Sequence, residues 1–198
     1  MIRRKKMNKE RLTTFIDAVL AIIMTILVLE LEKPNPVTIE GFFALKENFF
    51  AYALSFFWLG AMWVNLHNEW YHVEKISKKT VWATLLFLFF SSLFPYATNI
   101  VSTNFNNEIA QSFYGLIVIA ITLSNVLLYT TLIVPNQGIP QFEDHMKKRY
   151  NWLRIDILIK IIGLLITVII FPQAMIISVL ITLVFLVIPQ QFKTINSY

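Results

Sequence analysis

Long apolar segments alternate with short polar segments along the whole chain. Hydropathy predicts six membrane-spanning helices, most of them close to the about 20 residues that a helix needs to cross a bilayer. The predicted spans are residues 12–31, 49–66, 81–100, 109–134, 155–171 and 174–188. The last two are the shortest, and because only Pro172 and Gln173 separate them, we expect a hydrophobic helical hairpin. The pattern therefore predicts an all-α fold.

Prolines close several of these predicted helices, because proline has no N–H to donate and clashes with the preceding turn. Pro34 follows the first span, and Pro135 follows the fourth. Pro95 lies inside the third span, so we expect that helix to kink or end there. The longest loops, near residues 68–80 and 136–151, are too short to fold alone. The chain is therefore predicted to form one domain of residues 1–198.

The composition is typical of a polytopic membrane protein. Of the 198 residues, 57% are hydrophobic and 15% are charged, whereas about a quarter of the residues of a soluble domain are charged. The absence of cysteine excludes disulfides, thiolate metal sites and cysteine nucleophiles. The histidines have no paired spacing, so we expect no metal site and no cofactor. A membrane enzyme needs catalytic groups clustered at one face; the sequence offers no such cluster, and an enzyme is not expected.

The basic residues gather at the ends of the apolar spans, so the formal net charge of +5 does not indicate nucleic-acid binding. Cytoplasmic loops of membrane proteins carry an excess of Lys and Arg. One side of the predicted topology holds Arg3, Arg4, Lys5, Lys6, Lys9, Arg11, Lys75, Lys78, Lys79, Lys147, Lys148, Arg149, Arg154 and Lys193, and the other side holds Lys33 and Lys46. We therefore expect a multi-pass protein of the cell membrane with both termini cytoplasmic.

The first span carries a carboxylate, Asp17, six residues after Arg11. A charge at the bilayer centre costs about 3 kcal/mol on insertion scales, so this carboxylate needs a partner or water. We interpret it as one member of a structural polar cluster that joins Arg11 and Asp17 to His67 and Asn68 at the end of the second span. The alternative is that Asp17 and His67 relay protons.

The first span divides into two faces when it is wound at about 100° per residue. Five residues share one stripe: Ala18, Ile22, Thr25, Ile26 and Leu29. Asp17 lies about 140° from Ile22 and outside this stripe. Such a stripe is typical of ordinary helix packing. In an oligomer it would instead form a pore wall, whose hydrophobic constriction gates by dewetting.

Three polar residues near this stripe have two interpretations each. Thr25 would supply a hydroxyl to a partly dehydrated cation, or it bonds to the carbonyl of Ala21 within the helix, as threonine commonly does. Glu30 and Glu32, at the outer end of the span, would ring the pore entrance of an oligomer and concentrate cations. The alternative is that both are ordinary interfacial charges.

Three segments resemble the transmembrane protein 175 family: the first span, the end of the second span at Trp63–His67, and Phe94–Thr98. The signature of that family is an Arg, then Phe-Ser-Asp, then Ala-Ile, and a Thr three residues after the Ile. This chain has Arg11, Phe15-Ile16-Asp17, Ala21-Ile22 and Thr25. Arg11 and Asp17 match the residues that hold the first helix in place in that family. Ile16 stands where the family usually has Ser, which removes a hydroxyl from the polar cluster.

The resemblance implies both a function and an assembly. Members of the family are potassium-permeable channels of endosomes and lysosomes, and the smaller bacterial members have one six-helix unit and assemble as tetramers. Their first helix lines the pore. The resemblance therefore implies a homotetramer in the lipid bilayer, with Ile22 as the apolar bottleneck and with Ile26 and Leu29 extending it outward. Thr25 matches the position linked to potassium preference.

We therefore expect a channel that conducts K⁺ and other monovalent cations passively. Selectivity for K⁺ over Na⁺ should be modest, because the sequence lacks the Thr-Val-Gly-Tyr-Gly carbonyl filter of ordinary potassium channels. The alternative is a proton leak channel or a proton-coupled transporter that uses Asp17 and His67. The sequence shows no inverted repeat or broken helix pair of the kind that transporters use.

Overall fold

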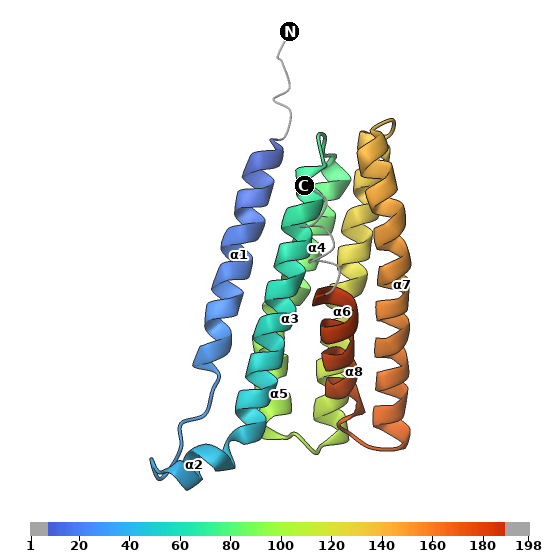
Figure 1. The fold of residues 1–198 in the computed structure, drawn as a ribbon. Helices are drawn as coiled ribbons and strands as arrows, with labels where there is room; N and C mark the ends of the chain where they lie inside the picture. The colour runs from blue at the N-terminus through green and yellow to red at the C-terminus, as the bar shows by residue number, and fades with distance from the viewer. Residues whose placement is uncertain (1–7, 189–198) are drawn as a thin grey trace.

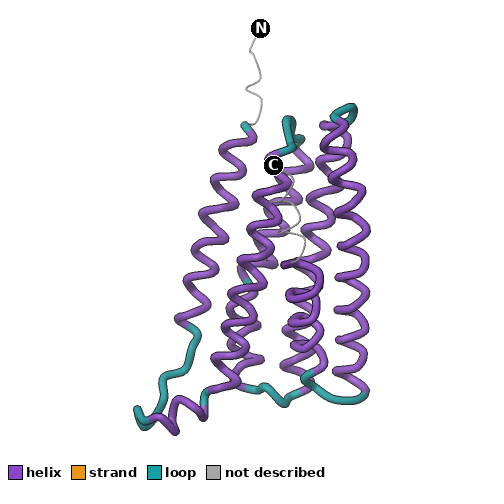
Figure 2. The backbone as a smooth tube through the Cα atoms, viewed as in Figure 1, coloured by secondary structure: helices purple, strands orange, loops and turns teal. Residues whose placement is uncertain are grey.

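The computed structural model describes residues 8–188, apart from the side chains of residues 145, 147, 148 and 186. The long helices lie side by side in one bundle, and a short helix lies across one end of it (Figure 1). No strand occurs in residues 8–188 (Figure 2), so the predicted all-α class is confirmed. Several basic residues used to predict the orientation, among them Arg3, Arg4, Lys5, Lys6 and Lys193, lie outside the described range.

The helices follow the predicted spans but differ from them in their ends. In chain order they are α1 (Lys9–Leu29), α2 (Ile39–Ala44), α3 (Lys46–Tyr71), α4 (Lys78–Ser92), α5 (Phe94–Thr103), α6 (Glu108–Ile133), α7 (Pro140–Ile169) and α8 (Ala174–Thr182). A 3₁₀ turn (Val134–Asn136) follows α6, and a π-helical segment (Leu183–Val187) follows α8. The short α2, in the connection between the first two spans, was not predicted.

Four helical segments are long and apolar enough to cross a membrane: Lys9–Leu29, Lys46–Tyr71, Lys78–Thr103 and Glu108–Asn136. They correspond to the first four predicted spans and indicate a multi-pass membrane protein. In α7, the predicted fifth span, Arg154, Asp156 and Lys160 interrupt the apolar half. The last apolar segment, Ala174–Phe185, is short for a bilayer core of about 30 Å. Length and composition therefore support four spans and do not confirm six.

Pro95 breaks the third predicted span, as expected. α4 ends at Ser92 and α5 begins at Phe94, with Pro95 in the first turn of α5. Proline has no N–H to give to the carbonyl four residues earlier, and its ring crowds that carbonyl. The first turn of a new helix tolerates proline, because the N–H groups there have no helical acceptor.

α7 is much longer than the predicted fifth span, since it begins at Pro140 instead of near Ile155. Residues 140–154 hold many charged residues, so hydropathy gives no sign of a helix there and predicts a loop over most of them. Pro140 is well placed at the start of the helix, where its fixed backbone angle is favourable. The bundle therefore extends beyond its apolar part through the first turns of α7.

Three charged side chains of α7 are buried and paired. Arg149 Nε lies 2.6 Å from Glu69 Oε1 of α3, and Lys160 Nζ lies 2.6 Å from Asp156 Oδ2, one turn before it. Lys160, 1% exposed, also donates a hydrogen bond to Thr122 Oγ1 of α6 at 3.0 Å. A buried charge without a partner is strongly destabilising. The two pairs therefore fix α7 against α3 and α6.

Arg149 is a cation in this position, because the guanidinium of arginine keeps its proton in proteins. Its contact with Glu69 joins the end of α3 to the polar part of α7.

Arg149→Met removes one partner of this pair and leaves Glu69, 4% exposed, without its counter-charge. Because such a loss costs about 3–5 kcal/mol, we expect the free energy of unfolding in non-ionic detergent to fall by that amount, as followed by circular dichroism. Arg154→Met, at an exposed site on the same helix, is the matched control and should stay within about 0.5 kcal/mol of the native chain. Equal losses in the two variants would contradict the assigned role.

Candidate functional site

α1 lies at one edge of the bundle (Figure 1) and packs on α3, α4 and α5. It is the most apolar of the four candidate spans and also the least buried. In its most apolar window 28% of the residues are buried, against 50% in each of the other three spans. A large exposed apolar face marks a contact with lipid or with another chain.

The predicted division of α1 into two faces is observed. Its buried face is formed by Leu12, Ile16, Leu20, Ile23 and Leu27. The stripe formed by Ala18, Ile22, Thr25, Ile26 and Leu29 is exposed, with Ile22 at 58% and Leu29 at 78%. Packing inside the subunit, the simplest interpretation of the stripe, is therefore wrong. The stripe is available to lipid or to other copies of the chain.

The Thr25 hydroxyl is bonded within the helix and exposed at the same time. It donates to the carbonyl of Ile22 at 2.7 Å, one residue later than the acceptor considered from the sequence. Because its proton is used in this bond, the oxygen presents lone pairs to its surroundings. The two roles weighed for Thr25, helix bonding and cation contact, are therefore compatible.

Asp17 lies on the flank of α1 that faces α3. Its Oδ1 accepts a hydrogen bond from Trp63 Nε1 at 2.8 Å, and the Trp63 ring lies 5.8 Å from the His67 ring one turn further along α3. The polar candidates at this end of the second span were Asn65, His67 and Asn68, beside Trp63, and the donor that bonds to Asp17 is Trp63 itself. The available signal was spacing, because residues four apart share one face of a helix.

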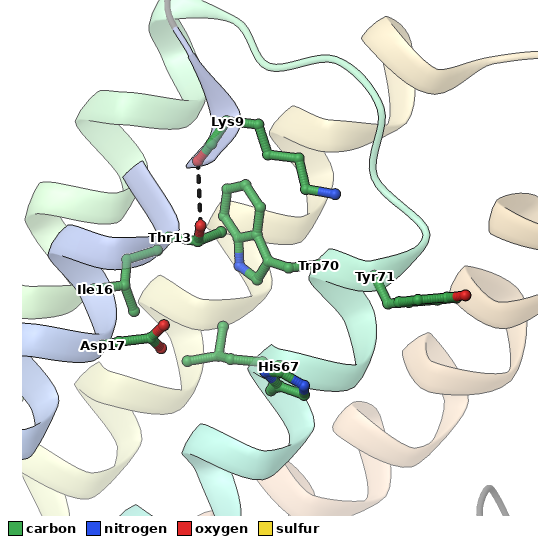
Figure 3. Close-up of a pocket in the computed structure, with 8 residues that line it drawn as sticks. Lys9, Thr13, Ile16, Asp17, His67, Trp70 and Tyr71 are labelled. Atoms are coloured by element: carbon green, nitrogen blue, oxygen red, sulfur yellow. Dashed lines mark hydrogen bonds between the residues drawn. The ribbon is translucent and has the colours of Figure 1, made fainter. Parts of the chain in front are cut away.

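A cavity of about 220 Å³ opens between the first turns of α1 and the last turns of α3. Asp17 and His67 line it from the two facing helices, together with Trp70 and Tyr71 (Figure 3). The Lys9 ammonium group, at the start of α1, donates to the carbonyl of Val73 at 2.6 Å. This bond joins the beginning of α1 to the loop after α3, so the two helices that line the cavity are held together at this end.

The predicted cluster of four residues is not formed within the subunit. Arg11 and Asp17 are six residues apart and therefore about 120° apart around the helix. Arg11 is exposed on the side of the stripe, and within residues 8–188 it makes no ion pair with Asp17. Asn68, partly buried, makes no hydrogen bond to Asp17 within the same range. The structure brings together Asp17 and His67, and adds Trp63.

The two acidic residues at the other end of α1 lie just beyond the helix. α1 ends at Leu29, and Glu30 is its cap residue. The carbonyl oxygen of Glu30 accepts a hydrogen bond from Asn99 Nδ2 of α5 at 3.1 Å, which fixes the chain as it leaves the helix. Glu32 is exposed in the following loop. Both follow the exposed stripe, so a ring of acids at a pore entrance remains a prediction.

Within the described residues, no three His, Asp or Glu side chains are arranged to hold a metal ion. What α1 presents is an apolar stripe that contains one hydroxyl and, on its flank, a carboxylate held by an indole.

Comparisons with known proteins agree with this picture. The sequence model of the family described as "Endosomal/lysosomal potassium channel TMEM175" matches residues 11–95, which include the stripe and Trp63. A potassium channel of Chryseobacterium sp. (strain P1-3) is 39% identical over 127 residues, which are 62% of this chain and 66% of that protein. A potassium channel of Streptomyces collinus (strain DSM 40733 / Tue 365) is 27% identical over 122 residues, 58% of this chain and 59% of that protein. The matches therefore span only part of each relative.

The fold has a solved counterpart over nearly its whole length. The crystal structure of a lysosomal potassium-selective channel TMEM175 homolog from Chamaesiphon minutus is similar to this structure with a TM-score of 0.67. The similarity covers 88% of this chain and 96% of that chain, at 20% sequence identity, and concerns the fold alone. Around α1 the chain is therefore similar to the TMEM175 family, whose model is described as a potassium channel and not an enzyme, and both bacterial relatives are named potassium channels.

Proposed function

We propose that the chain is one subunit of a potassium-permeable cation channel that conducts passively through a tetrameric pore lined by α1. The observation that carries this proposal is the exposed stripe on α1, with Ile22 at 58% exposure on the least buried candidate span. Relatives of the chain are named potassium channels. A ring of identical subunits with cyclic symmetry brings the same face of each copy to one axis.

In such a pore the stripe forms successive rings along the axis. Ile22, Ile26 and Leu29 are three or four residues apart, so their rings are about 4.5–6 Å apart along the helix. Bulky apolar side chains from every subunit at one level offer no ligand to a dehydrated cation and close the path by dewetting. Thr25, within one turn of Ile22, adds the only exposed hydroxyl of the stripe. We assign to it the preference for K⁺.

We further propose six spans per subunit, with α7 and α8 as the fifth and sixth and with both termini in the cytoplasm. The buried charges in the apolar half of α7, Lys160 and Asp156, are paired with each other inside the bundle. Paired charges that face a bundle interior are tolerated at membrane depth. Glu30 and Glu32 then lie at the outer entrance, where acids concentrate cations.

A proton leak or a proton-coupled transporter is the second candidate function. One observation favours it: Asp17 and His67 line the same cavity beside α1. The carboxylate is held by the neutral Trp63 indole and not by a second charge, so a proton could exchange there without breaking an ion pair.

Ile22→Asn tests the constriction. An amide at this position hydrates the bottleneck, so we expect K⁺ flux into proteoliposomes to rise about tenfold, which corresponds to a barrier lower by about 1.4 kcal/mol. The matched control is Ile162→Asn, at a side chain that is 47% exposed. Ile162 belongs to α7, the helix at the opposite edge of the bundle from α1 (Figure 1), so the flux should stay unchanged. If Ile22→Asn conducts like the native protein, the pore does not run along α1.

Thr25→Ala tests the selectivity assignment. Removing the hydroxyl should lower the ratio of K⁺ to Na⁺ permeability by about fivefold, equivalent to the ~1 kcal/mol that one hydrogen bond contributes. The readout is the reversal potential under bi-ionic conditions. Thr130→Ala on α6 is a close control, because its exposed hydroxyl makes the same kind of in-helix bond, to Leu127 at 2.7 Å. An unchanged ratio in Thr25→Ala would refute the assignment.

Asp17→Asn and Trp63→Phe separate the channel from the proton pathway. Trp63→Phe removes the donor of the 2.8 Å bond between α1 and α3, whereas Asp17→Asn keeps an acceptor oxygen for that bond and removes the titratable group. For a passive channel we expect native K⁺ flux without any proton gradient, and the two variants should behave alike. If proton flux is lost in Asp17→Asn and kept in Trp63→Phe, the proton pathway is correct and the channel proposal is wrong.

A further inference from the structure

α7 lies at the edge of the bundle opposite α1 and carries a second exposed apolar face (Figure 1). Ile155, Leu158, Ile161 and Leu165 are exposed along it, at 42–57%. They recur at intervals of three and four residues and so form one continuous strip. The buried face of the same helix carries Lys160 and its partner. The two sides of α7 therefore differ sharply, and the outer side has no partner within the described residues.

A polar group stands at one end of this strip. Arg154 and Asn151 are exposed. They lie on the same face as Ile155 and Leu158, because each precedes one of these two residues by four positions, or about one helical turn. Arg154 takes no ion pair within the described residues, whereas Arg149, one and a half turns earlier, is turned inward to Glu69. The strip thus begins with an exposed arginine that no described acidic side chain neutralises.

Aromatic side chains lie at the same level of the helix. Tyr150 is 49% exposed and Trp152 is 37% exposed. Tyr and Trp gather at membrane–water interfaces, where one part of the ring system meets headgroups and the rest meets hydrocarbon. With α7 as a membrane span, as proposed above, Arg154 lies at the depth of the lipid phosphates.

The surface is hollowed where these features meet. An open hollow of about 560 Å³ is lined by Asn151, Arg154, Ile155, Leu158 and Ile161. At its polar end, the Arg154 guanidinium can bind phosphate oxygens through bidentate hydrogen bonds. The Asn151 amide can donate a further hydrogen bond. Its apolar end extends about 10 Å along the helix, from Arg154 to Ile161.

We propose that this face of α7 binds an anionic phospholipid, with the phosphate on Arg154 and Asn151 and an acyl chain along Ile155, Leu158 and Ile161. The occupant is a lipid and not a soluble partner, because a charge at one end and a purely apolar strip at the other match the order of headgroup and chain in a bilayer. An anionic lipid is preferred because Arg154 has no ion-pair partner in the described part of the chain. Basic residues next to spans attract anionic lipids in this way.

The test measures lipid binding to the purified full-length chain. Native mass spectrometry gives the apparent Kd for dioleoylphosphatidylglycerol, with dioleoylphosphatidylcholine as the zwitterionic comparison. We expect the native chain to prefer the anionic lipid and Arg154→Gln to bind it about fivefold more weakly, since one arginine near the surface contributes ~1 kcal/mol. Arg154→Lys should retain most of the binding. Leu158→Asn should weaken both lipids, because it removes the contact with the chain.

Lys75→Gln is the matched control. Lys75 is exposed in the loop between α3 and α4, on the side of the membrane that is rich in basic residues, and it has no apolar strip beside it. The Lys75→Gln variant should have a Kd within about twofold of the native value, which is a smaller change than the loss of one hydrogen bond would cause. If Lys75→Gln weakens binding as much as Arg154→Gln, or if Arg154→Gln binds like the native chain, the site on α7 is refuted. Neither outcome concerns the pore, which the flux variants on α1 test separately.

Discussion

A charge inside an apolar helical bundle must be paired, and this constraint determines how α7 is held in the structure. Lys160 is buried beneath Trp58, with its ammonium group 5.0 Å from the ring centre and 2.6 Å from the Asp156 carboxylate. Arg149 meets Glu69 of α3 in the same way. Each pair offsets a desolvation cost that neither partner could sustain alone. The outer face of α7 is consequently left with apolar residues and Arg154.

The same constraint explains the position of α1. Its one intramembrane acid, Asp17, lies on the flank and is satisfied by the Trp63 indole, so no charge remains between Ala18 and Leu29. The exposed stripe is therefore uninterrupted and apolar except for Thr25. A helix that buries so little of itself against its own subunit leaves this stripe available to further copies of the chain, as the proposed pore requires. This is how the proposed function follows from the packing.

Features that depend on neighbouring residues could be predicted from the sequence. The faces of α1 follow from helical periodicity, and the break before Pro95 follows from the chemistry of one residue. Features that depend on distant residues could not. Glu69 and Arg149 are far apart in the sequence, and each resembles an ordinary loop or interfacial charge until the fold brings them together. For the same reason the polar half of α7 resembled a loop, and Trp63 was overlooked as the donor to Asp17.

The two exposed edges of the subunit differ in one feature: α1 exposes small residues beside the bulky Ile22, Ile26 and Leu29, whereas the exposed apolar strip of α7 contains only large residues. On α7 the exposed side chains are large, among them Leu158, Ile161 and Leu165, as suits contact with lipid chains. On α1 the exposed side includes Ala18, Ala21 and Thr25, three and four residues apart. Small residues in a line let the backbones of membrane helices approach closely, and lipid gains nothing from them. This difference supports the proposal that α1 faces other copies and α7 faces the bilayer, which is the radial order that a ring of subunits around a pore requires.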